Sequence, residues 1–170
     1  MLNKRFIWAV LVVAFICTGS ALAQTSLTLK SLDGAMVDVQ AQKNKVVVLA
    51  VGASWLPLSK DQAVITNKLA KKYAGQQVAI YWVSNDSDNA KSKNYATDDQ
   101  LKAFADKNKL MMSVLRDPTG QVLKRFGVDQ IPAFVILDKT GKISGTSFGG
   151  IDPESDITPD IAAKIDSLLK

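Results

Sequence analysis

Residues 46–60 read VVVLAVGASWLPLSK, and this stretch decides the fold of the chain. The overlapping run Lys45–Val51 is rich in β-branched residues and has no internal polar residue, which is typical of a strand buried on both faces of a helix-covered sheet. A helix is predicted directly afterwards, over about residues 57–73, because its apolar residues recur at a spacing of four. The apolar stripe of this helix is Ile65, Leu69 and Tyr73. The stretch therefore predicts a buried strand that ends in a short loop and continues into a helix.

Shorter strand and helix patterns lie on both sides of this central unit. Before it, the alternating segments Leu27–Leu29 and Met36–Val39 flank a turn at Leu32–Gly34 and predict a β-hairpin. After it, strands are predicted over 78–83, 113–115, 133–137 and, as the return strand of a hairpin, 142–148. Helices are predicted from the capping-box sequence Thr97–Gln100 onward, over residues 121–126, and along the stripe Ile157, Ile161, Ile165 and Leu168. The order βαβαβαββα after the hairpin predicts an α/β domain, in which helices pack on a sheet.

The N-terminal residues have the three parts of a secretory signal peptide. Lys4-Arg5 gives a positive start, residues 6–16 are an unbroken apolar run, and residues 21–23 (ALA) form a small-x-small cleavage sequence. We therefore expect a signal peptide over residues 1–23, which contacts the membrane only during export, and a mature periplasmic domain over residues 24–170. The alternative is an uncleaved membrane anchor, although the apolar run is shorter than the ~20 residues that a spanning helix needs.

Reactive side chains are scarce in this chain of 170 residues. It has no histidine and one cysteine, Cys17, which lies inside the predicted signal peptide. Histidine general bases, histidine metal sites and an internal disulfide are therefore excluded, and the mature domain has no thiol. Removal of Lys4 and Arg5 lowers the formal charge from +5 to +3, and this small charge is scattered along the chain. The composition therefore predicts no nucleic-acid partner.

The segment Trp55–Ser59 (WLPLS) stands where the predicted strand meets the predicted helix. In this place it resembles the active-site segment of thioredoxin-like proteins, especially the secreted TlpA/ResA-type thiol–disulfide oxidoreductases and the AhpC/TSA-like redoxins. Members of that superfamily carry Trp-Cys-x-x-Cys at the head of the helix. By this match Leu56 occupies the position of the first cysteine and Ser59 that of the second.

Two further segments extend the resemblance. Residues 127–134 (GVDQIPAF) resemble the Gly-Val-x-x-x-Pro-Thr segment of these proteins, which makes Pro132 the counterpart of their cis-proline. Residues 138–143 (DKTGKI) match the Asp-x-x-Gly-x-Ile hairpin that follows it. The matching pieces occur in order along nearly all of residues 27–169. The resemblance implies a thioredoxin-like fold, with a central mixed sheet, flanking helices and an N-terminal β-hairpin.

The chemistry of these relatives does not carry over to the residues of this chain. Dithiol exchange needs a thiolate that attacks a disulfide and a second thiol that resolves the mixed disulfide, whereas Leu56 has no nucleophilic group. The Ser59 hydroxyl is a poor nucleophile without a base, and the chain has no histidine to activate it. We therefore predict no catalytic residue, no dithiol catalysis and no cofactor.

Binding is the function that remains for this site. The residues expected to line it are Trp55, Leu56, Pro57, Leu58, Ser59, Ile131 and Pro132. In thioredoxin-like folds the backbone before the cis-proline pairs with an extended peptide, so the resemblance implies a peptide or protein partner. Two plainer interpretations stay open. In one, Trp55 and Leu56 simply pack on the domain; in the other, Ser59 and Gln62 form a capping box at the start of the helix.

Three functions follow from these alternatives. We favour a redox-inactive module that binds an extended peptide or protein partner or assists assembly. The resemblance implies the second, a thiol–disulfide oxidoreductase or antioxidant redoxin. An uncleaved N-terminus would indicate the third, a membrane-tethered structural subunit.

The remaining motifs carry weaker signals. Residues 85–89 (NDSDN) offer oxygen ligands of the kind that calcium takes, but the glycine and terminal glutamate of a calcium loop are absent. A solvated loop and no metal site are therefore predicted there. The acidic segment Asp152–Asp156 is expected to cap the last helix, and Met111 and Met112 are expected to fill the core.

Overall fold

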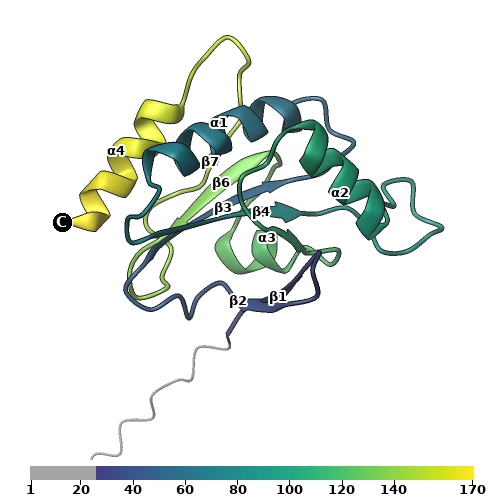
Figure 1. Cartoon of the computed structure of the whole chain (residues 1–170), viewed down its shortest axis with the longest axis horizontal. Coiled ribbons are helices and arrows are strands. Elements are labelled where there is room, and N and C mark those ends of the chain that lie inside the picture. Colours follow the sequence, from purple (N-terminus) through teal and green to yellow (C-terminus); the bar gives the residue numbers. More distant parts are fainter. Residues whose placement is uncertain (1–25) are drawn as a thin grey trace, which may run out of the picture.

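The computed structural model describes residues 26–170, which are built around a seven-stranded sheet (Figure 1). Its strands are β1 Thr28–Ser31, β2 Met36–Asp38, β3 Val46–Gly52, β4 Val78–Ser84, β5 Val114–Arg116, β6 Ala133–Leu137 and β7 Phe148–Gly149. Its helices are α1 Ser59–Lys72, α2 Asp98–Lys107, α3 Gln121–Phe126 and α4 Thr158–Leu169. The predicted signal peptide, its cleavage point after Ala23, and Cys17 lie outside the described residues.

Strand β3 lies inside the sheet, and all seven of its residues are buried. It pairs in parallel with β4 and antiparallel with β6, and β5 runs parallel to β4 on the far side. The β1–β2 hairpin joins antiparallel to β5, while β7 forms the opposite edge, which gives the order β2-β1-β5-β4-β3-β6-β7. The structure thus has the mixed sheet and the N-terminal hairpin that the sequence predicts.

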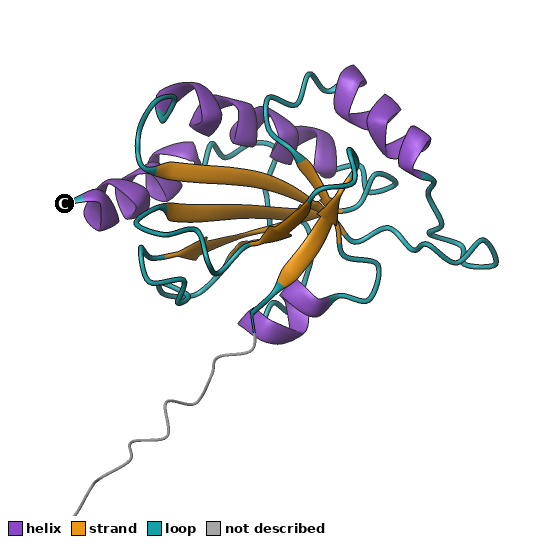
Figure 2. Cartoon of the chain, turned by 60° about the horizontal axis from the view of Figure 1, so that its bottom comes forward, coloured by secondary structure: helices purple, strands orange, loops and turns teal. Residues whose placement is uncertain are grey.

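The side chains of β3 alternate between two cores. Residues 46, 48 and 50 face the core beneath α1 and α4, in which Leu69 and Ile161 are fully buried. Residues 47, 49 and 51 face a second core, which Val122 of α3 helps to close. In Figure 1, α1, α2 and α4 lie above the sheet and α3 lies below it, and Figure 2 shows the same arrangement from another direction. Helices on both faces explain why β3 is a continuous apolar run rather than an alternating one.

The helices follow the predicted signals. The buried stripe of α1 is Ile65, Leu69 and Tyr73. At the start of α2 the capping box is present: the Gln100 N–H donates to Thr97 Oγ1 at 3.1 Å, and the Thr97 N–H donates to Gln100 Oε1 at 2.8 Å. Before α4, Asp156 accepts from the Thr158 N–H at 3.0 Å, and the Lys68 ammonium 2.7 Å away helps to lower the pKa of Asp156 to about 2. No helix within residues 26–170 is both long and apolar enough to span a bilayer.

The predicted return strand over residues 142–148 is wrong for most of its length. Only its end pairs, as β7, together with a single bridge between Leu137 and Ile143. Gly145 between these points has a φ of +84°, a left-handed conformation that ends an extended strand.

The placement of Met111 in the core is also wrong, because its side chain is 57% exposed. Its backbone N–H donates to Asn67 Oδ1 on α1 at 3.1 Å, so the chain is directed towards that helix before β5 begins. Met112 is partly buried against the core, as expected.

Candidate functional site

The candidate site lies where the end of β3 meets the start of β6. Val51 lies opposite Ala133 in the antiparallel register of these strands, so the residues that follow β3 come beside those that precede β6. The peptide bond between Ile131 and Pro132 is cis, as the resemblance implies. The loop over residues 53–58 and the cis-proline therefore share one end of the sheet, although they are far apart in the sequence.

Gln62, in the first turn of α1, links the helix to both strands. Its side chain is fully buried, and its amide Nε2 donates to the carbonyl oxygens of Ala133 at 2.8 Å and of Val51 at 3.2 Å. These two bonds fix the beginning of α1 against the end of the sheet that carries Pro132. The amide oxygen Oε1 is also buried and has no hydrogen-bond partner among residues 26–170.

The predicted capping box of Ser59 and Gln62 is wrong. Ser59 is the first residue of α1, and Leu58 holds the N-cap position without a side-chain hydrogen bond. The Ser59 hydroxyl is fully buried and accepts from the Ala53 N–H at 3.3 Å. Gln62 turns towards the sheet because the carbonyl acceptors of β3 and β6 lie within its reach.

Gly52 packs closely against the side chains of Ser59, Gln62 and Trp82. A Cβ atom at Gly52 would lie 2.5 Å from Gln62 Oε1 and 3.0 Å from both Ser59 Oγ and Trp82 Cζ2. Glycine at this position therefore lets a hydroxyl, an amide and an indole ring pack directly against the β3 backbone. Neither an amide nor an indole accepts a proton from serine at neutral pH, and Leu56 has no nucleophilic group. The arrangement therefore holds the start of α1 and the loop before it against β3 and β6.

The apolar side chains at this end of the sheet differ in exposure. We call the set the apolar rim, and its members are Trp55, Leu56, Pro57, Leu58, Ile131 and Pro132. Trp55 is 56% exposed and therefore does not pack into the domain, whereas Leu56 is half-buried beside it. Pro132 is the one buried member of the rim, so it adds no exposed surface to it. An exposed tryptophan among half-buried apolar neighbours is typical of a surface that binds another molecule.

The backbone of Ile131 is also available at this end of the sheet. Both ladders of β6, with β3 and with β7, begin at Ala133. Ile131 takes part in none of the backbone hydrogen bonds that form the turns and loops of residues 26–170. Its N–H and C=O are therefore free to pair with an extended chain.

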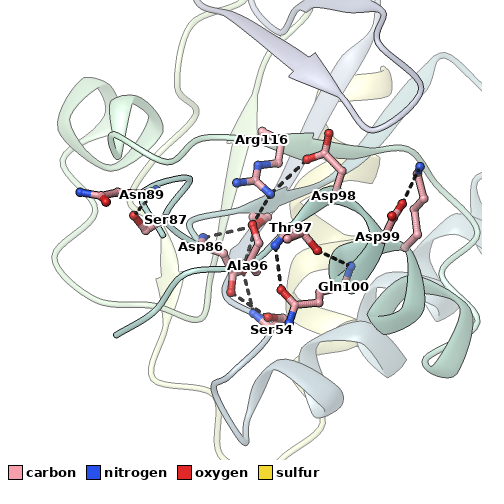
Figure 3. A network of polar contacts seen from close by, with 12 residues as sticks. Ser54, Asp86, Ser87, Asn89, Ala96, Thr97, Asp98, Asp99, Gln100 and Arg116 are labelled. Carbon is pink, nitrogen blue, oxygen red and sulfur yellow. Dashed lines mark hydrogen bonds and ion pairs between the residues drawn. The ribbon is translucent and has the colours of Figure 1, made fainter. Parts of the chain in front are cut away.

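Asp86 is a site residue that the sequence pattern does not reveal. It is 1% exposed, and its carboxylate accepts hydrogen bonds from the Ser54 N–H at 2.9 Å and the Ser54 hydroxyl at 2.7 Å (Figure 3). The Ser84 hydroxyl donates to it as well, at 2.8 Å. The prediction of a solvated loop over residues 85–89 is therefore wrong for Asp86, although Asp88 is exposed. A usable signal was that Ser54 and Asp86 follow neighbouring parallel strands, whose carboxyl ends meet at one edge of a sheet.

The segment that follows Asp86 is held in place by side chains of α2 and β5. Arg116 Nη1 donates to the Ala96 carbonyl oxygen at 2.9 Å and forms an ion pair with Asp98 at 3.2 Å (Figure 3). Within residues 26–170, no group of three or more acidic, histidine or cysteine side chains is arranged to hold a metal ion.

Replacing Asp86 by asparagine is expected to lower the free energy of unfolding by about 1–3 kcal/mol. All three groups that face the carboxylate are donors, so the amide nitrogen of asparagine leaves at least one of them without an acceptor in a buried place. Urea unfolding followed by circular dichroism measures the loss. Asp88→Asn makes the same change at an exposed position and should alter stability by less than about 0.5 kcal/mol. Equal stability of the two variants would contradict the role given to Asp86.

Comparison with known proteins places the chain among redoxins. The model of the AhpC/TSA family matches residues 22–146. The thiol-disulfide oxidoreductase ResA of Bacillus thuringiensis subsp. konkukian is 28% identical over 112 residues, which cover 66% of this chain and 60% of ResA. The thioredoxin-like protein YneN of Bacillus subtilis is 30% identical over 122 residues, which cover 72% of this chain and 67% of YneN. The matched part thus spans less than two thirds of ResA.

Solved structures confirm the predicted fold. A structure assigned to the thiol:disulfide interchange protein DsbE of Chlorobium tepidum superposes with a TM-score of 0.70 at 21% sequence identity. The match covers 85% of this chain and 94% of that protein. The fold is therefore thioredoxin-like, with a mixed sheet flanked by helices.

Proposed function

Because the chain belongs to the AhpC/TSA family yet has no cysteine after Cys17, we propose that it is a redox-inactive thioredoxin-like module that binds an extended segment of another protein. The observation that carries this proposal is that neither of the two positions that match the cysteines holds a thiol. Leu56 is a half-buried apolar residue, and Ser59 is a fully buried hydroxyl that accepts a bond from the backbone. The surrounding backbone is nevertheless held in a defined position: Gln62 bonds to both β3 and β6, and the bond before Pro132 is cis.

The proposed binding mode uses the backbone and the apolar rim together. An extended segment pairs with the free N–H and C=O of Ile131, as in other cases where a strand adds to a sheet. Its side chains then pack against Trp55 and Leu56. A tryptophan that buries its ring on binding contributes a large apolar area with little loss of side-chain freedom.

The N-terminal pattern supports a location outside the inner membrane. We propose that residues 1–23 direct export to the periplasm and are then removed. In that oxidising compartment, a domain without thiols cannot be trapped in disulfides with its partners. An uncleaved segment would keep the same domain at the membrane surface.

Leu56→Asp is expected to weaken binding of an unfolded chain by at least about tenfold, which corresponds to about 1.4 kcal/mol. The introduced carboxylate must lose water when the rim is covered, and nothing in the rim pairs with it. The probe is reduced, carboxymethylated ribonuclease A, which is extended, has no free thiol and contains no tryptophan of its own. Protection of exposed Trp55 from quenching by acrylamide measures binding, while buried Trp82 contributes a constant background.

The matched control is Met36→Asp, which places the same charge at a 66% exposed position on β2. Its affinity for the probe should equal that of the unmodified chain. Equal affinity of the Leu56→Asp variant would show that binding does not involve the rim. A probe that gives no protection of Trp55 at all would refute the proposed function.

The names of the relatives raise a second candidate, thiol–disulfide exchange. It is favoured by the match to ResA and by the family to which the chain belongs. It is opposed by the residues at positions 56 and 59, since neither supplies a thiolate. An activity assay separates the two candidates, as argued in the Discussion.

A further inference from the structure

Half of β4 has an open edge. β3 pairs with β4 from Val78 to Ser84, whereas β5 pairs only with Trp82–Ser84. Residues 78–81 therefore have a neighbouring strand on one side only.

The hydrogen bonds of β4 show which of its backbone groups face this open edge. The Trp82 N–H donates to the Ser113 carbonyl oxygen at 3.1 Å, so residue 82 points towards the β5 side. The Gln77 carbonyl oxygen accepts from the Val46 N–H at 3.0 Å, so residue 77 points towards β3. Because this direction alternates along a strand, the N–H and C=O of Ile80 point away from β3. None of the backbone hydrogen bonds found in the turns and loops of residues 26–170 satisfies these two groups.

A groove of about 610 Å³ runs along the same edge. Val78 and Ile80 line it from β4, the C-terminal end of α1 forms one wall, and residues 110–113 form the other. It exists because the Met111 N–H bonds to Asn67 on α1 instead of continuing β5 along β4. The two walls leave the edge recessed, so a single extended chain fits it better than the edge strand of a second folded copy.

We propose that an extended segment of a partner protein binds in this groove and adds a strand to the edge of β4. The Ile80 N–H and C=O pair with one residue of that segment. Alternate side chains of a strand point to one face, so apolar residues at every second position of the segment would contact Leu110 and Met112 in the wall. The groove lies at the Val78 end of β4, and the apolar rim lies beyond its other end. The inference is therefore independent of the function proposed for the rim.

Amide hydrogen exchange followed by NMR tests both steps of this proposal. In the free chain, the Ile80 amide should exchange at least about tenfold faster than those of Ala79 and Tyr81, which bond to β3. The probe is a short synthetic peptide that alternates threonine and valine between terminal glutamates. At about ten times its Kd, this peptide should slow exchange at Ile80 about tenfold, because the amide is protected only in the complex.

Two controls separate the groove from the rest of the surface. A peptide with proline in place of each valine lacks the alternating donors and should give no protection at Ile80. A bulky maleimide attached through Met111→Cys should fill the groove and lower the affinity for the valine peptide at least about tenfold. The same group attached through Met36→Cys should leave this affinity unchanged. With no other cysteine after Cys17, the label in the processed chain goes to one position.

Three results would overturn the proposal. The first is an Ile80 amide that already exchanges slowly in the free chain. The second is an exchange rate of the Ile80 amide that stays the same when the valine peptide is added at about 1 mM, a concentration that would reveal even weak binding. The third is equal binding by the two labelled variants. Quenching of Trp55 reports the rim separately, so failure of the proposed function would be recognised as a different result.

Discussion

The double variant Leu56→Cys, Ser59→Cys is expected to catalyse thiol–disulfide exchange, an activity that we propose the unmodified chain lacks. Position 56 is half-buried at the surface of the loop and position 59 is the first residue of α1. A helix N-terminus stabilises a thiolate, so the pKa of the thiol introduced at position 56 should fall below its usual value. Pro57 and the cis-proline at Pro132 already stand beside these positions, and the second thiol supplies the resolving step.

Precipitation of reduced insulin in the presence of dithiothreitol measures this gain. The double variant should shorten the lag clearly, whereas Leu56→Cys alone should shorten it much less, because its mixed disulfide has no internal resolving thiol and waits for dithiothreitol to attack it. Failure of the two introduced thiols to form an intramolecular disulfide on oxidation would contradict the match of these positions to the cysteines of the relatives.

Gln62→Glu is expected to destabilise the domain by at least about 3 kcal/mol at pH 7, because it places an unpaired carboxylate in a buried position. The amide of Gln62 donates to the carbonyl oxygens of Val51 and Ala133, and an ionised carboxylate has no proton to donate to either. Repulsion between the carboxylate and these oxygens adds to the cost of burial. Urea unfolding measures the loss, and Gln77→Glu, at an exposed position, is the matched control.

The destabilisation should depend on pH with a definite sign. Burial raises the pKa of the introduced carboxyl in the folded state above its unfolded value of about 4.3. Below that value both states are protonated and the penalty is smallest, since a neutral carboxylic acid still donates one hydrogen bond. As the pH rises from there to the folded-state pKa, the unfolded chain releases its proton first and the variant loses stability; above that pKa the loss is constant. If the difference in unfolding free energy between the Gln62→Glu and Gln77→Glu variants did not change with pH, burial of the side chain at position 62 would be contradicted.

The parts of the fold that the sequence predicts well are those decided by local periodicity. The uninterrupted apolar run before Gly52 becomes a strand buried on both faces, and the stripe at Ile65 and Leu69 becomes the buried face of α1. The capping box at Thr97 forms as expected because both of its partners lie within one turn. In each case the interacting groups are near one another in the chain.

The errors arise where distant segments compete for the same group. Ser59 and Gln62 have the spacing of a capping box, but the carbonyls of Val51 and Ala133 take the Gln62 amide once β3 and β6 pair. Asp86 lies in a polar segment that reads as solvated, yet the residues that bury its carboxylate belong to β4 and the loop after β3. Pairing of the strands has to be known before either side chain can be placed.

The proposed binding role of the apolar rim rests on particular residues and not on the fold alone. The sequence places Trp55 next to a match for the first cysteine, and the structure leaves its ring 56% exposed. The resemblance supplies the cis-proline, which the structure confirms at Pro132. The identity of the partner depends on side chains of another molecule, which neither the sequence nor the fold of this chain contains.

Insulin reduction by the unmodified chain, processed after Ala23, tests most directly whether this site has lost thiol chemistry. With dithiothreitol present, insulin should precipitate at the rate that dithiothreitol alone gives, because neither Leu56 nor Ser59 forms a mixed disulfide. Acceleration of precipitation by the unmodified chain, abolished by Leu56→Asp, would contradict a redox-inactive binding module.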